Sequence, residues 1–74
     1  MKIFIFQKLQ IKDLSFENVC CFRFLPQAII VAEREYTDLS GNVLCDIQSS
    51  SKETYLVISK KDSRILGRII STII

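Results

Sequence analysis

The sequence contains no histidine and no tryptophan, and only two glycines and one proline occur among its 74 residues. Without histidine, the chain lacks the side chain that most often serves as a general base or a metal ligand near neutral pH. Two glycines are too few for the glycine-rich loops that hold nucleotide phosphates. We therefore expect no enzymatic activity, no catalytic residues and no cofactor.

The three cysteines, Cys20, Cys21 and Cys45, are also few. A structural zinc site needs four ligands, usually in spaced pairs of cysteine or histidine, so we expect no metal site. An odd cysteine count without a secretory signal argues against a disulfide framework and indicates a reducing compartment. The sequence thus favours an intracellular, cytoplasmic location, with Cys20 and Cys45 as small buried apolar residues.

Long hydrophobic runs are absent, although 49% of the residues are apolar and the mean hydropathy is +0.28. The longest uninterrupted apolar run covers residues 28–32. A transmembrane helix needs roughly 20 mostly apolar residues, so no transmembrane segment is predicted. The length indicates one small domain over residues 1–74. A domain of this size leaves much of its surface exposed, so some of its apolar residues are expected to meet a partner.

Hydrophobic alternation predicts strands at 3–11, 19–25, 43–48 and 54–59, separated by polar turn segments. Two further segments fit either a strand or a helix. In 27–38, Pro26 and the spacing of Ile29, Ala32, Tyr36 and Leu39 favour a helix ending near Gly41, whereas the run of β-branched residues favours a strand. In 64–74, apolar pairs recur every four residues, but five isoleucines and Gly67 favour a strand.

These segments together predict an all-β protein, a small antiparallel barrel or sandwich of about six short strands. The alternative is an α+β fold with helices near 27–39 and 63–74. The two differ only in the state of the ambiguous segments.

Charge is unevenly distributed, although the net charge is only +2. Residues 1–12 and 47–74 are basic, and residues 13–46 between them are acidic. If the terminal strands are neighbours, basic side chains from both ends gather on one side. The second of our two functional hypotheses is therefore weak binding of nucleic acid or an anionic surface. Its candidate residues are Lys60, Lys61, Arg64 and Arg68.

The leading hypothesis is a non-catalytic protein–protein interaction module, or a small subunit of a homo- or hetero-oligomer. Chain ends are usually polar and loosely held. This sequence instead places isoleucines densely at its C-terminal end, and its N-terminal segment is also apolar. We expect these terminal segments to pair with each other or to bind a protein partner. The candidate partner-binding residues are Ile3, Phe4, Ile69, Ile70, Ile73 and Ile74.

Overall fold

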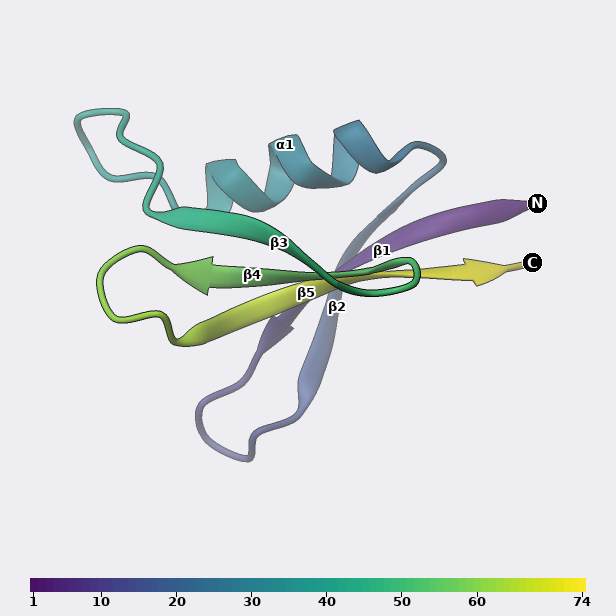
Figure 1. Ribbon diagram of the computed structural model, residues 1–74, viewed down its shortest axis with the longest axis horizontal. Helices are drawn as coiled ribbons and strands as arrows, with labels where there is room; N and C mark the ends of the chain where they lie inside the picture. Colours follow the sequence, from purple (N-terminus) through teal and green to yellow (C-terminus); the bar gives the residue numbers. More distant parts are fainter.

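The computed structural model describes residues 1–74 and shows one antiparallel sheet with a single helix lying across one face (Figure 1). Across the sheet the strand order is β2-β1-β5-β4-β3. The predicted small antiparallel β-rich domain is confirmed, as an open five-stranded sheet instead of a closed barrel. The elements in chain order are β1 (Lys2–Leu9), β2 (Phe16–Phe22), α1 (Leu25–Glu35), β3 (Cys45–Ser51), β4 (Thr54–Ser59) and β5 (Ile65–Ile73).

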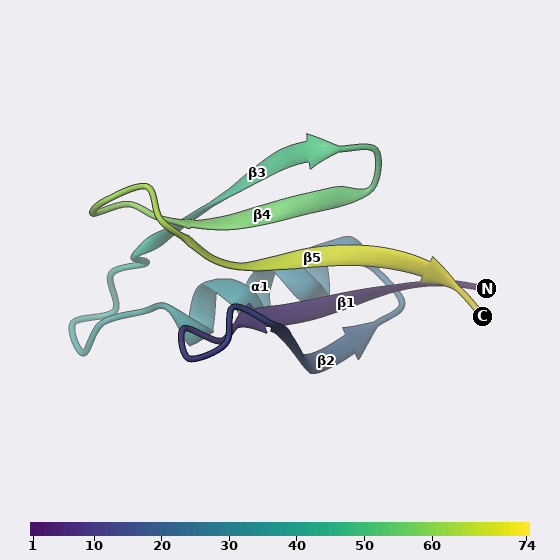
Figure 2. The same ribbon diagram turned by 90° about the horizontal axis from the view of Figure 1, so that it is seen from below.

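The first and last strands, β1 and β5, pair at the centre of the sheet, from Lys2 opposite Ile73 to Lys8 opposite Gly67. The two ends of the chain lie side by side (Figure 2). The Met1 ammonium donates to the Ile74 carbonyl, and the Ile74 amide donates to the Met1 carbonyl, both at 2.8 Å. The apolar terminal segments therefore pair with each other, which was one of the two expected outcomes.

Of the two alternatives for residues 27–39, the helix is present, and it begins at Leu25 and ends at Glu35. Pro26 lies in its first turn, where a missing amide proton costs no hydrogen bond. Ala28 and Ala32, one turn apart, are completely buried and let the helix axis approach the sheet closely.

The predicted extension of this helix to residue 39 is wrong. The Thr37 hydroxyl donates to the Glu33 carbonyl at 2.5 Å, and the Asp38 carboxylate accepts hydrogen bonds from the amides of Ser40 and Asn42. These side-chain bonds compete with the helical ladder and turn the chain at Gly41, where φ is +88°. Leu39, expected on the apolar face of the helix, is fully exposed in this turn.

Residues 65–73 form a strand, as the β-branched composition favours, and not the alternative helix near 63–74. In a strand, successive side chains point to opposite faces, so Ile69 is completely buried under α1 while Ile70 lies on the other face. A helix would have placed both on one side.

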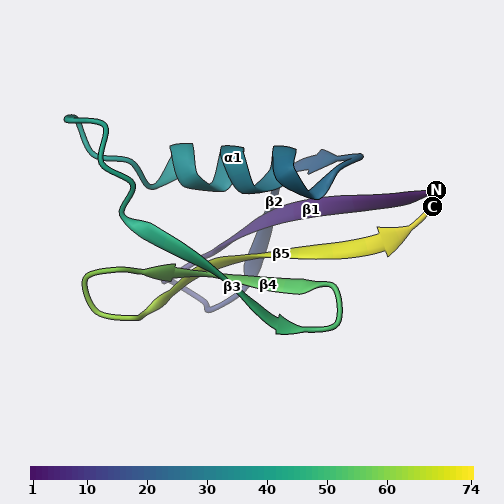
Figure 3. The ribbon, with the colours of Figure 1, turned by 45° about the horizontal axis from the view of Figure 1, so that its top comes forward.

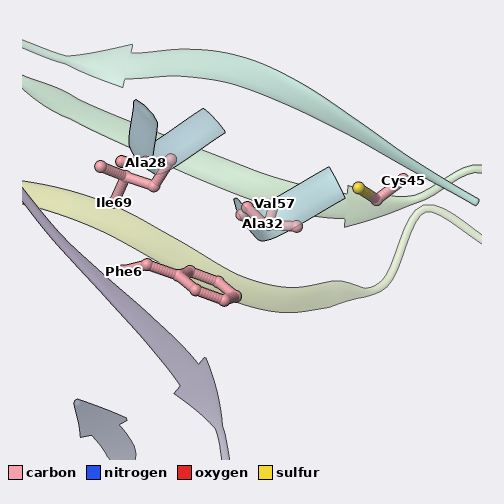
Figure 4. Packing of buried hydrophobic residues seen from close by; sticks show 6 residues of the cluster. All are labelled: Phe6, Ala28, Ala32, Cys45, Val57 and Ile69. Atoms are coloured by element: carbon pink, nitrogen blue, oxygen red, sulfur yellow. The ribbon is translucent and has the colours of Figure 1, made fainter. Parts of the chain in front are cut away.

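The core lies between α1 and one face of the sheet (Figures 3 and 4). Each strand except β2 contributes a side chain to it, and α1 contributes its two buried alanines. Tyr36, just beyond the helix, packs edge-to-face against Phe6 with ring centroids 6.5 Å apart. The completely or almost completely buried apolar residues are Phe6, Ala28, Ala32, Cys45, Val57 and Ile69.

Gly67 lets β5 approach β1 at the centre of the sheet. A Cβ atom at this position would collide with the backbone carbonyl oxygen of Gln7. Because that oxygen belongs to the backbone of the neighbouring strand, it cannot move aside as a flexible side chain would. The central strand pairing therefore depends on a glycine at position 67.

We expect Gly67→Ala to lower the free energy of unfolding by about 1–3 kcal/mol, the usual cost of an overpacked site. Urea unfolding at a fixed protein concentration measures the change. Thr72→Ala is the matched control because Thr72 is an exposed residue of the same strand. Equal losses in the two variants would show that the contact with Gln7 is not limiting.

Candidate functional site

The face of the sheet that points away from α1 has no layer covering it (Figure 3). Because Phe6, Val57 and Ile69 point into the core, their sequence neighbours point to the opposite side. Cross-strand register places Ile5 beside Ile70 on that side. We call this surface the open face. Its half-buried aliphatic side chains near the central strands are Ile3, Ile5, Leu56, Ile58 and Ile70.

A row of polar side chains crosses the centre of the open face. Gln7 is 9% exposed and uses both ends of its amide. Its Nε2 donates to Asn18 Oδ1 at 2.6 Å, and its Oε1 accepts from Arg68 Nε at 2.7 Å. These two bonds run from β2 through β1 to β5 and orient the Arg68 side chain.

Arg68 is held on its other side by an aromatic ring. Its guanidinium carbon lies 3.8 Å from the centroid of the Phe16 ring, which is stacking distance. The ion pairs of the protein are Lys2–Glu53, Lys8–Glu35 and Arg64–Asp62, so Arg68 has no carboxylate partner. The open face therefore carries an oriented, partly buried positive charge among aliphatic residues.

An acidic residue lies on the same face, two strands away. Asp46 on the edge strand β3 pairs in register with Ile58 on β4. Since Cys45 and Ile47 pack into the core, the exposed Asp46 side chain points to the open face. Arg68 and Asp46 are thus complementary charges on opposite sides of the aliphatic residues of β4.

The structure distributes the candidate partner-binding residues over three environments. Ile69 is completely buried in the core, and Phe4 packs against the core on the side of α1. Ile3 and Ile70 lie half-buried on the open face. Of the six candidates, only the two C-terminal isoleucines are largely exposed, where the two chain ends meet. These are Ile73, 78% exposed, and Ile74, 69% exposed.

The candidate anion-binding residues are also divided. Lys60, Lys61 and Arg64 are exposed around the turn that joins β4 to β5. Arg68 lies within β5 on the open face, bonded to Gln7. Antiparallel pairing of β1 and β5 brings the basic end of β1 to this turn. The terminal strands are therefore neighbours, which is the condition under which basic residues from both ends were expected to gather.

A pocket of about 580 Å³ lies where the β1–β2 loop meets the start of β5. Lys8, Lys12 and Arg64 contribute three cationic side chains to its lining, and no acidic residue lines it. Six apolar or aromatic residues form the rest of the wall with Gln10. Sequence reasoning missed this pocket. Its only local signal is the apolar pair Ile11 and Leu14 within an otherwise polar turn.

One of the three cations of this pocket is already neutralised. Lys8 Nζ lies 2.6 Å from Glu35 Oε1 at the end of α1, and this hydrogen bond raises the pKa of the Lys8 ammonium. The Lys8 Nζ also lies 6.0 Å from the centroid of the Tyr36 ring. Burial raises the pKa of Tyr36, whose hydroxyl donates to the Leu66 carbonyl. Lys8 and Tyr36 are therefore held in place, and Lys12 and Arg64 carry the net charge of the pocket.

The cysteines lie on the two opposite edge strands, with Cys20 and Cys21 on β2 and Cys45 on β3. Cys45 is buried, as predicted, and burial raises the pKa of its thiol. The prediction that Cys20 is buried is wrong, because Cys20 is exposed on the edge strand β2. No three histidine, cysteine or acidic side chains converge on one point.

The thiols should accordingly differ in reactivity. We expect Cys20 and Cys21 to react with a disulfide reagent such as DTNB in the native protein, while Cys45 reacts only on unfolding. Spectrophotometric thiol counting with and without guanidinium chloride measures this. Cys45→Ser should leave the fast phase intact, and three equal rates in the native protein would contradict the burial of Cys45.

No helix of the structure has both the length and the apolar character needed to cross a membrane. Comparison with protein-family models, curated proteins and solved structures found no match.

Proposed function

We propose that the protein is a non-catalytic interaction module that self-associates through its open face. The observation that supports this most strongly is the uncovered sheet face with aliphatic side chains at its centre. An antiparallel sheet that faces water normally alternates apolar inward and polar outward residues. Here Leu56, Ile58 and Ile70 put apolar side chains on the outward face as well. Contiguous apolar surface of this kind marks interaction sites.

A second copy of the chain suits this face because of its charges. In a two-fold symmetric interface, a residue i of one copy contacts j of the other, and j contacts i. Arg68 on β5 and Asp46 on β3 lie on either side of β4. With neighbouring strands about 4.8 Å apart, the two positions are roughly 10 Å apart across the sheet. A two-fold axis along β4 sets β5 of each copy opposite the partner's β3, with Arg68 two residues along the strand from Asp46, because Arg68 pairs with Leu56 and Asp46 pairs with Ile58.

The same axis brings the aliphatic residues together. Leu56 and Ile58 would pack against their own symmetry mates at the centre of the interface. An axis placed on β5 would instead set two Arg68 guanidinium groups against each other, and like charges at close range are unfavourable. Gln7 on β1 and Phe16 on β2 hold the Arg68 side chain in the free protein, so Arg68 exchanges these contacts for the partner's carboxylate when the dimer forms. We therefore propose a face-to-face dimer centred on β4.

Leu56→Thr tests the apolar centre by replacing leucine with a more polar, β-branched residue that still suits a strand. Each dimer loses the substituted side chain twice, so we expect the dissociation constant to rise on the order of 30-fold. Sedimentation equilibrium over a range of concentrations measures it. Ile30→Thr is the control because Ile30 is about half exposed, on the outer side of α1, and should leave the constant unchanged. A wild-type protein that stays monomeric at millimolar concentration would overturn the proposal.

A charge exchange tests the proposed pairing. Asp46→Lys alone should weaken the dimer because it places two cations together at each of two symmetric positions. Adding Arg68→Glu should restore association toward the wild-type value. High salt should reduce the difference between the single and double variants, since exposed charges are screened. A double variant weaker than Asp46→Lys itself would show that these residues do not face each other across the interface.

A further inference from the structure

We propose that the pocket between the β1–β2 loop and the start of β5 binds a small amphipathic anion, with an acidic head group and an aliphatic tail. The pocket lies apart from the centre of the open face, so this site does not depend on the proposed dimer. Its volume of about 580 Å³ falls within the range of small-molecule sites, roughly 300–1,000 Å³.

The head group is specified by charge. Lys12 and Arg64 stand at the pocket without an acidic lining residue to neutralise them. Lys12 forms no ion pair, and the Nε of Arg64 lies 3.9 Å from Asp62 Oδ2, which is too long for a hydrogen bond. Lys8 is already engaged by Glu35. An anionic head group would therefore meet Lys12, which has no ion-pair partner, and Arg64, whose only ion pair is the long contact with Asp62 outside the pocket lining.

The tail is specified by the wall of the pocket. Ile11 and Leu14 are 78% and 73% exposed on the β1–β2 loop, an unfavourable state for such large aliphatic side chains. Across the pocket from this loop, β5 supplies Ile65 and Leu66. A nonpolar tail lying between them would remove apolar surface from water on both sides, which stabilises the complex.

The loop holds Leu14 in a strained conformation. Its φ is +59°, in the left-handed region that bulky residues rarely adopt. The Leu14 amide donates to the Gln10 carbonyl at 2.8 Å, and the Asp13 carboxylate accepts from the Ser15 amide and hydroxyl. These bonds hold the turn, and they lower the pKa of the Asp13 carboxyl. Leu14 is thus kept at the pocket although glycine would suit its backbone better.

Because Leu14 is strained, its side chain can be removed without destabilising the fold, and the effect on binding can then be measured. Leu14→Gly relieves the backbone and removes the side chain, so it should fold at least as stably as the wild type. Decanoate, below its micelle concentration, is the probe. We expect saturable binding by isothermal titration calorimetry, with amide shifts in NMR spectra confined to the β1–β2 loop and the start of β5. Leu14→Gly should weaken this binding.

The contribution of charge to binding is tested in two ways, by removing the charge of the ligand's head group and by removing the charge of each cationic side chain. Decanol, which has the same tail without the charge, should bind at least about tenfold more weakly. Arg64→Gln and Lys12→Gln should each weaken decanoate binding and leave decanol binding unchanged. Lys60→Gln is the matched control, because Lys60 is an exposed lysine of the adjacent turn that does not line the pocket.

Three outcomes would overturn the proposal. Equal binding of decanoate and decanol would exclude recognition of the head group. Amide shifts centred on Leu56 and Ile58 would place the ligand on the open face instead. Failure of decanoate to saturate below its micelle concentration would show that the pocket holds no such ligand. Leu56→Thr, which disrupts the proposed dimer, should not alter decanoate binding, so the two proposals fail or succeed independently.

Discussion

The pairing of β1 with β5 is the interaction on which the rest of the structure depends. These strands are farthest apart in the sequence, yet they form the centre of the sheet. Their close approach requires Gly67 against the Gln7 carbonyl. Because Gln7 sits at this contact, its side chain reaches Arg68 on one side and Asn18 on the other. One backbone contact thus organises both the core face and the polar row of the open face.

The single helix α1 covers only one face of the sheet. A single eleven-residue helix shields part of a five-stranded sheet, and its buried residues are the small Ala28 and Ala32. Close packing over that area completes a compact core, and no other element of residues 1–74 lies over the opposite side. The apolar excess of the sequence therefore divides between a closed face and an open one. This division is the physical basis for proposing a second copy as the missing layer.

The sequence predicted the strands where alternation and β-branched residues act together, as at 54–59. It left residues 27–39 undecided because the β-branched run at 29–31 favours a strand, whereas Pro26 and the helical spacing of the apolar residues favour a helix. Cys20 shows a different limit. Its residue type favours burial, yet Cys20 is exposed on one edge strand while Cys45 is buried on the other, so burial depends on tertiary packing that residue type does not specify. The pocket was missed for the same reason, because its walls come from segments about fifty residues apart.

Strand β5 distributes the basic residues of the C-terminal segment over two surfaces of the protein. The strand begins beside Arg64 at the pocket and carries Arg68 onto the open face four residues later. Four residues in a strand span about 13 Å, so the two arginines serve separate surfaces. Arg64 lies with Lys12, where a small anion can meet two cations. Arg68 has no carboxylate partner within the chain and lies beside Gln7 and Phe16 on the open face, where we propose that it meets a carboxylate of a second copy. The two proposed kinds of recognition therefore use different arginines of the basic C-terminal segment, which the geometry of one strand separates.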